Sequence, residues 1–112
     1  MAVSTIGGNV LAIGVFSISI DVASVAAAIS AEQTFTAPGV KVGDMVFVNP
    51  PAVGTATLNA GLGVAGVRVT AADTIGIRFI NATAGALDPS VAVAYAVLVV
   101  RPESGTFSGF AP

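Results

Sequence analysis

The chain is 112 residues long, and only 9% of its residues are charged whereas 54% are hydrophobic. Average domains are about one-quarter charged, so this surface is thinly charged, and a thinly charged surface tends to associate. The absence of cysteine and histidine excludes disulfides, most transition-metal sites and the usual catalytic triads, and four scattered cations exclude a nucleic-acid patch. We therefore expect one domain that is not an enzyme, has no cofactor, binds neither nucleic acid nor a small-molecule substrate, and buries its surface against copies of itself or a larger assembly.

The most apolar stretch, residues 10–29, does not have the pattern of a membrane span. Asp21 lies near its centre, and a carboxylate at mid-bilayer costs about 2.5–3.5 kcal/mol on insertion scales. Residues 1–20 lack the basic region of a signal peptide. An apolar arm or strand is favoured, and we expect no membrane partner.

Alternating segments in the first half of the chain predict strands. Residues 16–22 alternate between apolar and polar side chains, which is the period of a half-buried strand. A second run starts at about residue 24 and ends at Thr36, before a Pro38-Gly39 turn. Residues 45–48 form a third strand, which Asn49, Pro50 and Pro51 end. The alanine-rich residues 22–29 could make two helical turns, but their flanks indicate strand.

The second half contains the clearest hairpin. Residues 64–70 and 74–80 alternate on either side of a turn at residues 71–73. A flexible stretch, residues 52–63, precedes this hairpin, and a loop from 81 to 90 follows it. The last strand, residues 91–101, is apolar on both faces, which predicts a central or interface strand.

Short strands separated by glycine and proline turns indicate an all-β fold. We expect a small antiparallel β-sandwich, jelly-roll-like, with an extended N-terminal arm and a flexible C-terminal tail. The expected division places the arm and first strand in residues 1–23, the sandwich domain in 24–102 and the tail in 103–112.

Catalytic and ligand-binding motifs are weak. Residues 61–66 match the spacing GxGxxG, but a strand rather than a helix follows, so a glycine-rich bulge entering a sheet is the better interpretation. The six carboxylates are dispersed singly, without the pairs of a glycosidase or a divalent-metal site. Asp44, Asp73 and Asp88 lie at turns, where their side chains are expected to bond to nearby backbone.

Three arginines are the most informatively placed charges: Arg68 and Arg78 lie on the hairpin arms, and Arg101 ends the last strand. They are either solvated side chains or partners for carboxylates of neighbouring subunits, because arginine suits interface ion pairs. We list them as subunit-interface candidates, together with Tyr95 in the last strand and Phe107 and Phe110 in the tail.

Residues 30–102 carry a pattern of turns and strands that resembles a known family. The pattern comprises AEQTFT at 31–36, PGVKVGD at 38–44, VFVNPP at 46–51, AGLGVAGVRVTAADTI at 60–75, IRFINATAGA at 77–86 and LVVRP at 98–102. It is similar to the capsid decoration, or cement, proteins of tailed bacteriophages. The resemblance implies a non-enzymatic virion protein on the outer surface of the phage head, assembled in the host cytoplasm, that stabilises the capsid by bridging major capsid protein subunits.

Such a role implies a homo-oligomer, with a trimer favoured, whose ends dock on the capsid. Residues 1–13 could be a capsid-binding arm, with Gly7-Gly8 as a hinge ahead of Val10, Leu11 and Ile13. The alternative is an interaction module of a phage tail or fibre, or of a secreted cell-surface adhesin. A carbohydrate-binding version of that alternative is weak, because the chain has no tryptophan and one tyrosine.

Overall fold

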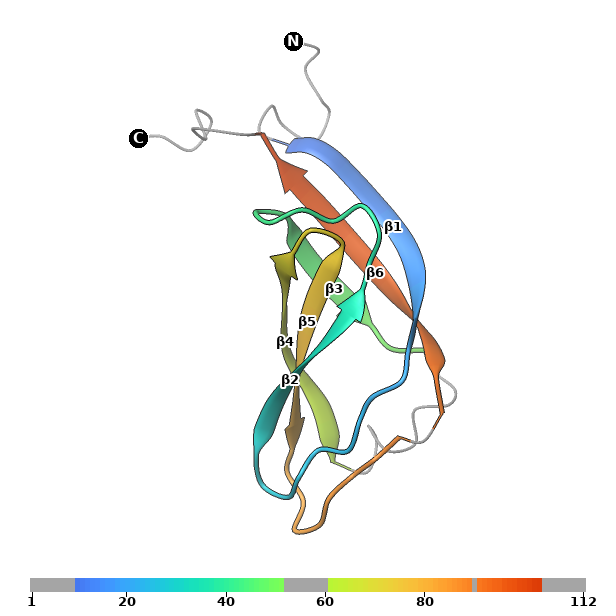
Figure 1. The fold of residues 1–112 in the computed structure, drawn as a ribbon, viewed down its shortest axis with the longest axis vertical. Coiled ribbons are helices and arrows are strands. Elements are labelled where there is room, and N and C mark those ends of the chain that lie inside the picture. The colour runs from blue at the N-terminus through green and yellow to red at the C-terminus, as the bar shows by residue number, and fades with distance from the viewer. Residues whose placement is uncertain (1–9, 52–60, 90, 104–112) are drawn as a thin grey trace, which may run out of the picture.

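The computed structural model describes residues 10–51, 61–89 and 91–103, and within these ranges the chain is all-β, as expected. Two three-stranded antiparallel sheets form the fold (Figure 1). Their strands are β1 (Val10–Ile20), β2 (Ser30–Thr36), β3 (Met45–Asn49), β4 (Leu62–Ala71), β5 (Thr74–Asn81) and β6 (Val93–Pro102). No helix long and apolar enough to cross a membrane occurs in the described ranges.

The first sheet has the order β1-β6-β3, so β6 is its central strand. This confirms the central position predicted from the apolar side chains on both faces of the last strand. At the middle of β6, Val97 is opposite Phe16 of β1, and Leu98 is opposite Phe47 of β3. The ordered strand begins at Val93, two residues later than expected.

The second sheet has the order β2-β5-β4 and contains the predicted hairpin. Its β4–β5 turn places Asp73 at a φ of 59°, a left-handed conformation that aspartate tolerates better than most residues. β2 begins at Ser30, later than the expected start near residue 24, because the chain turns at Ala28, whose φ is 57°. The alanine-rich residues 22–29 are not helical, and Val25 forms an isolated bridge with Leu87.

The expected glycine bulge is present at the start of β4. The pairing of β4 with β5 shifts between Val64 and Gly66, so Ala65 is an extra residue in the strand. Gly61, just before the strand, has a φ of 123°, and a Cβ there would lie 2.5 Å from the Cγ2 atom of Thr83. The motif therefore bends the chain into a sheet, as predicted, and no helix follows it.

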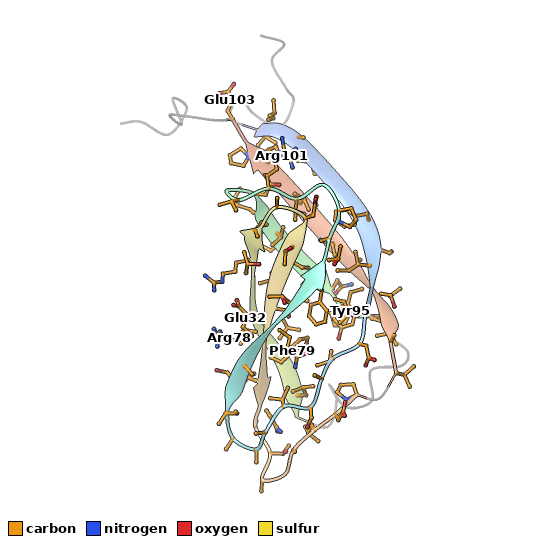
Figure 2. The ribbon with its side chains drawn as sticks, in the orientation of Figure 1. Glu32, Arg78, Phe79, Tyr95, Arg101 and Glu103 are labelled. Atoms are coloured by element: carbon orange, nitrogen blue, oxygen red, sulfur yellow. The ribbon has the colours of Figure 1, made fainter. Side chains whose placement is uncertain are left out.

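One hydrophobic core lies between the sheets. Its largest fully buried side chains include Phe79, Tyr95, Ile20 and Leu62. The Phe79 ring packs edge-on against Phe35 of β2, with ring centroids 6.5 Å apart. Figure 2 shows Phe79 and Tyr95 in this interior. Ile18 and Ile20 of β1 belong to the core, so the first strand is built into the same folded unit as the others.

The expected arm requires a correction. Val10, Leu11 and Ile13 are residues of β1 and are not a free arm, because β1 pairs with β6 from Val10 opposite Pro102 onward. A register shift between Val10 and Ala12 leaves Leu11 as a bulge residue, 65% exposed. Residues 1–9 of the expected arm, and Phe107 and Phe110 of the expected tail, lie outside the described residues.

Candidate functional site: an apolar sheet face and an adjoining groove

The outer face of the β1-β6-β3 sheet carries a contiguous set of large apolar side chains. Two rows run across the three strands, one through Leu98 and one through Val100 of β6. We call this set the apolar face, and its members are Ile13, Val15, Met45, Phe47, Leu98 and Val100. Val15 is 70% exposed and Phe47 is 55% exposed. Contiguous exposed apolar patches of this kind mark interaction sites.

No charged side chain occupies an outward position of these three strands. The rows next to the apolar face hold small or uncharged polar residues, namely Ser17, Ala96 and Asn49 in one row and Ser19 and Ala94 in the next. An apolar centre with an uncharged polar margin is the composition of a protein–protein interface core and rim. The sheet face is therefore suited to burial against another protein.

The outer face of the second sheet differs because it carries charge. Arg68 of β4 donates two hydrogen bonds to Glu32 of β2, from Nε to Oε2 at 2.8 Å and from Nη2 to Oε1 at 2.9 Å. The pair passes over Gly76 of β5, where a Cβ would lie 2.8 Å from the Glu32 carboxyl carbon. The hydrogen bond from Arg68 lowers the pKa of Glu32, and the charge of Arg78 adds to this effect. Figure 2 shows Glu32 and Arg78 near one another.

A groove of about 220 Å³ opens between the N-terminal half of β1 and the loop at residues 38–40. Ala12, Gly14 and Phe16 line it from β1, and Val99 and Arg101 line it from β6. Ile13 of β1 also borders the groove. The groove is hollow because two of its four β1 residues, Ala12 and Gly14, are small, and a Cβ placed on Gly14 would meet nothing within 4 Å.

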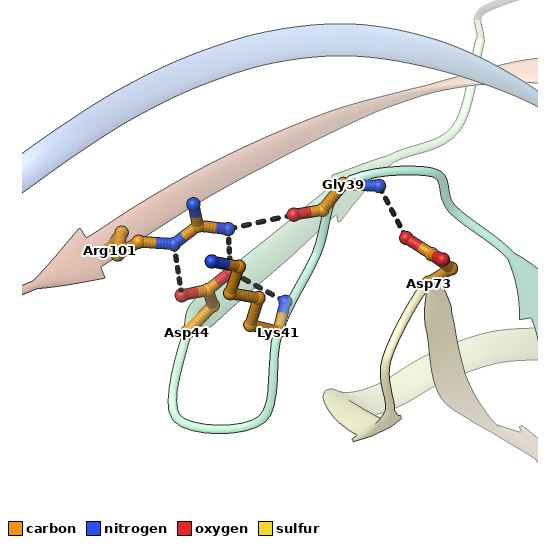
Figure 3. Close-up of polar contacts among 5 residues, drawn as sticks. All are labelled: Gly39, Lys41, Asp44, Asp73 and Arg101. Carbon is orange, nitrogen blue, oxygen red and sulfur yellow. Dashed lines mark hydrogen bonds and ion pairs between the residues drawn. The ribbon is translucent and has the colours of Figure 1, made fainter.

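The loop that forms the far wall of the groove is held from both sides (Figure 3). From β6, Arg101 Nη2 donates to the Gly39 carbonyl at 2.7 Å. From the β4–β5 turn, Asp73 Oδ1 accepts a hydrogen bond from the Gly39 N–H at 2.8 Å. Gly39 has a φ of 96°, so glycine is favoured at this position. The wall is therefore fixed by partners from two sheets.

Asp44 completes the support of this loop. Its carboxylate accepts hydrogen bonds from Arg101 Nε at 2.9 Å, from Arg101 Nη2 at 2.8 Å and from the Lys41 N–H at 2.9 Å. The Arg101 hydrogen bonds, chiefly, lower the pKa of Asp44, although burial of the carboxylate opposes them. Within the described ranges, Nη1 of Arg101 makes no hydrogen bond.

These contacts revise the expected roles of the arginines. Arg68 and Arg101 form ion pairs with Glu32 and Asp44 of the same chain, so both arginines have a charged partner in a single copy. Arg78 is exposed and has no ion pair among the described residues. The turn role expected for Asp44 is confirmed, since it accepts a hydrogen bond from the Lys41 N–H three residues earlier. Asp73 instead accepts one from the N–H of Gly39, which is 34 residues away in the sequence.

Tyr95 also requires a correction, because it is a core residue. Only 1% of it is exposed in the isolated chain, and burial raises the pKa of its phenol. It points inward from β6 beside Val97 and Val99, so it does not present a surface to a neighbouring subunit.

Residues of the apolar face on β3 and β6 were not among the sequence-predicted candidates. Met45 and Phe47 alternate with the inward Val46 and Val48, so the third strand is apolar on both faces, as the last strand is. In the sequence, two strands that are apolar on both faces indicate that an outer surface is covered by a partner. Because β3 pairs with β6, their outward apolar side chains form one patch.

In the described ranges, no group of three or more acidic side chains lies close enough to hold a metal ion. Comparison of the chain with protein-family models, with curated proteins and with solved structures found no match.

Proposed function

We propose that this protein is a non-enzymatic structural protein of a tailed-phage virion, which decorates the outside of the head and stabilises it by bridging major capsid protein subunits. The sequence resemblance over residues 30–102 suggests this role. The observation that carries it is the apolar face, since a surface without charge and with several large apolar side chains needs a protein partner to cover it.

The two outer faces of the molecule fit this role differently. The apolar face of the first sheet contacts the major capsid protein, and the second sheet, with Glu32, Arg68 and Arg78, faces solvent. Of the residues first assigned to a capsid-binding arm, Ile13 belongs to the apolar face and Leu11 is exposed beside it. Val10 begins the same strand.

A homo-oligomer, with a trimer favoured, is part of the proposal, as is a jelly-roll-like sandwich with a terminal arm and tail. Repeated copies on a capsid lattice bind with avidity, so a modest contact by each copy is sufficient. No step of the role requires chemistry, which agrees with the dispersed carboxylates of the sequence.

Co-sedimentation with purified capsids of the corresponding phage tests the proposal. The intact protein is expected to pellet with capsids, and Val15→Lys and Phe47→Lys are expected to lose at least tenfold in affinity, because each buries a charge in the interface core. Thr34→Lys is the matched control, since Thr34 is an exposed position on the outer face of the second sheet.

The outcomes distinguish whether the protein binds capsids from whether the apolar face is the binding surface. If the intact protein does not pellet with capsids, the proposed function is wrong, and binding to phage tails or to host cells would support the alternative interaction module. If the intact protein and both lysine variants bind equally well, the role stands but the apolar face is not the contact.

A further inference from the structure

We propose that the groove between β1 and residues 38–40 receives the phenylalanine-bearing segment 104–112 of a neighbouring copy, with Phe107 as the anchoring side chain. This inference rests on the homo-oligomer of the proposed function and names the contact that forms it. The site is incomplete in a single copy, because the neighbouring copy supplies the ring that fills it.

The groove has the size and chemistry for an aromatic ring. Its volume of about 220 Å³ exceeds the roughly 150 Å³ of an apolar protein cavity that binds benzene. Ala12, Gly14, Pro38 and Val40 present no polar side-chain atom to it. Its one charged lining residue, Arg101, is already neutralised by Asp44. An uncharged apolar occupant therefore fits better than an ion.

Arg101 adds a polar anchor at one end of the groove. Its Nη2 and Nε atoms bond to Gly39 and Asp44, which holds the guanidinium in place. Nη1 carries two further N–H donors, and neither bonds to a described residue. A backbone carbonyl of an entering segment can accept a hydrogen bond there while its side chain fills the apolar part.

The C-terminal segment has the matching composition and starts at the right place. Residues 104–112 (SGTFSGFAP) have no charge, and Phe107 and Phe110 are their only large side chains. The described chain ends at Glu103, directly after Pro102, which pairs with Val10 at the end of β1 that borders the groove. Nine further residues can span at most about 30 Å, which is enough to reach a neighbouring copy.

The direction of β6 favours the neighbouring copy as the acceptor. β6 runs along the groove through Val99 and Arg101 and then leaves it, and Pro102 restricts the backbone at the exit. A segment that continues outward enters another copy without reversing. Such a contact joins two different surfaces. Head-to-tail contacts of this kind form a ring when the rotation between copies closes, and a trimer is such a ring.

Two variants of the full chain, each altering one side of the contact, test the inference by light scattering. Phe107→Ser with Phe110→Ser removes the rings, and Gly14→Val places a branched side chain in the groove, where its Cβ meets nothing within 4 Å. Gly66→Val is the matched control, because it places the same side chain in open space on a strand of the other sheet. Ala12→Leu is a second groove-filling variant, and circular dichroism checks that every variant is folded.

We expect the unaltered chain and Gly66→Val to be oligomers and the other three variants to be monomers. A 1:1 mixture of the serine variant with Gly14→Val should form a dimer and no larger species, because one has an intact groove and the other has intact phenylalanines. The inference would be overturned by any of three results. These are a monomeric unaltered chain, oligomers that persist in the serine variant or in both groove-filling variants, and a mixture that stays monomeric. Solution mass does not depend on capsids, so failure of the proposed function would be seen separately, in the co-sedimentation assay.

Discussion

Replacement of Asp44 by alanine is the most direct test of how the groove wall is held. The carboxylate accepts three hydrogen bonds, two from Arg101 and one from the Lys41 N–H. Its side chain is only 3% exposed, whereas that of Arg101 is 26% exposed. Removal of Asp44 therefore leaves the partly buried Nε of Arg101 and the Lys41 N–H without this acceptor, whereas Nη2 of Arg101 keeps the Gly39 carbonyl.

The magnitude follows from these contacts. Hydrogen bonds to a charged group contribute about 1.5–3 kcal/mol each, but the three share one carboxylate and are not additive. Water can reach part of Arg101 and replaces some of the loss. We expect Asp44→Ala to lower the free energy of unfolding by about 2–3 kcal/mol, which corresponds to a Tm roughly 10–20 °C lower for a domain of this size.

Urea unfolding followed by circular dichroism measures the effect, with Glu32→Ala as the matched control. Glu32 also forms an ion pair with two hydrogen bonds, but its partner Arg68 is 69% exposed, so its loss should be clearly smaller. An Asp44→Ala protein as stable as the unaltered chain, or no less stable than Glu32→Ala, would refute this account of the wall.

Three further predictions concern the described polar contacts. Arg101 lowers the pKa of Asp44, so this pair stabilises the fold fully above the unfolded-state pKa of about 3.9 and stops doing so as the pH falls through the lower folded-state pKa. Between about pH 7 and pH 2, the urea midpoint of Asp44→Asn should therefore fall less steeply than that of the unaltered chain. Asn81→Ala should cost about 2–3 kcal/mol in urea unfolding, because the buried amide bonds to the carbonyls of Val25 and Gly85, and an unchanged midpoint would contradict this. Gly76→Ala should displace the Glu32 carboxyl group, so the salt dependence of the Tm should weaken; an unchanged salt dependence would show that the pair persists.

The local elements were predictable from short patterns. The β4–β5 hairpin, the bulge at residues 61–66 and the central position of the last strand each follow from alternation, glycine placement or apolar side chains on both faces. These signals depend on residues close together in the chain, so no knowledge of the tertiary arrangement is needed to interpret them. The length of the first strand was not predictable in this way, because residues 10–13 are ordered by pairing with β6, more than 80 residues later in the chain.

The partners of the charged side chains could not be predicted from the sequence, because they too lie far apart along the chain. Asp44 and Arg101 are 57 positions apart, and Asp73 and Gly39 are 34 apart. Nothing near either arginine in the sequence distinguishes a partner in the same chain from one in a neighbouring subunit. Only the arrangement of the two sheets brings Arg101 to the loop and Arg68 across β5 to Glu32.

By itself, the sequence determined that this protein is all-β, that it has few charges and that much of its surface is apolar. The tertiary structure decided where that apolar surface lies. Strand pairing places β1, β6 and β3 side by side and collects their outward side chains into one uncharged face, while the second sheet receives the Glu32–Arg68 pair. The physical reason is that alternation within a strand specifies two faces, but only pairing between distant strands specifies which faces are joined.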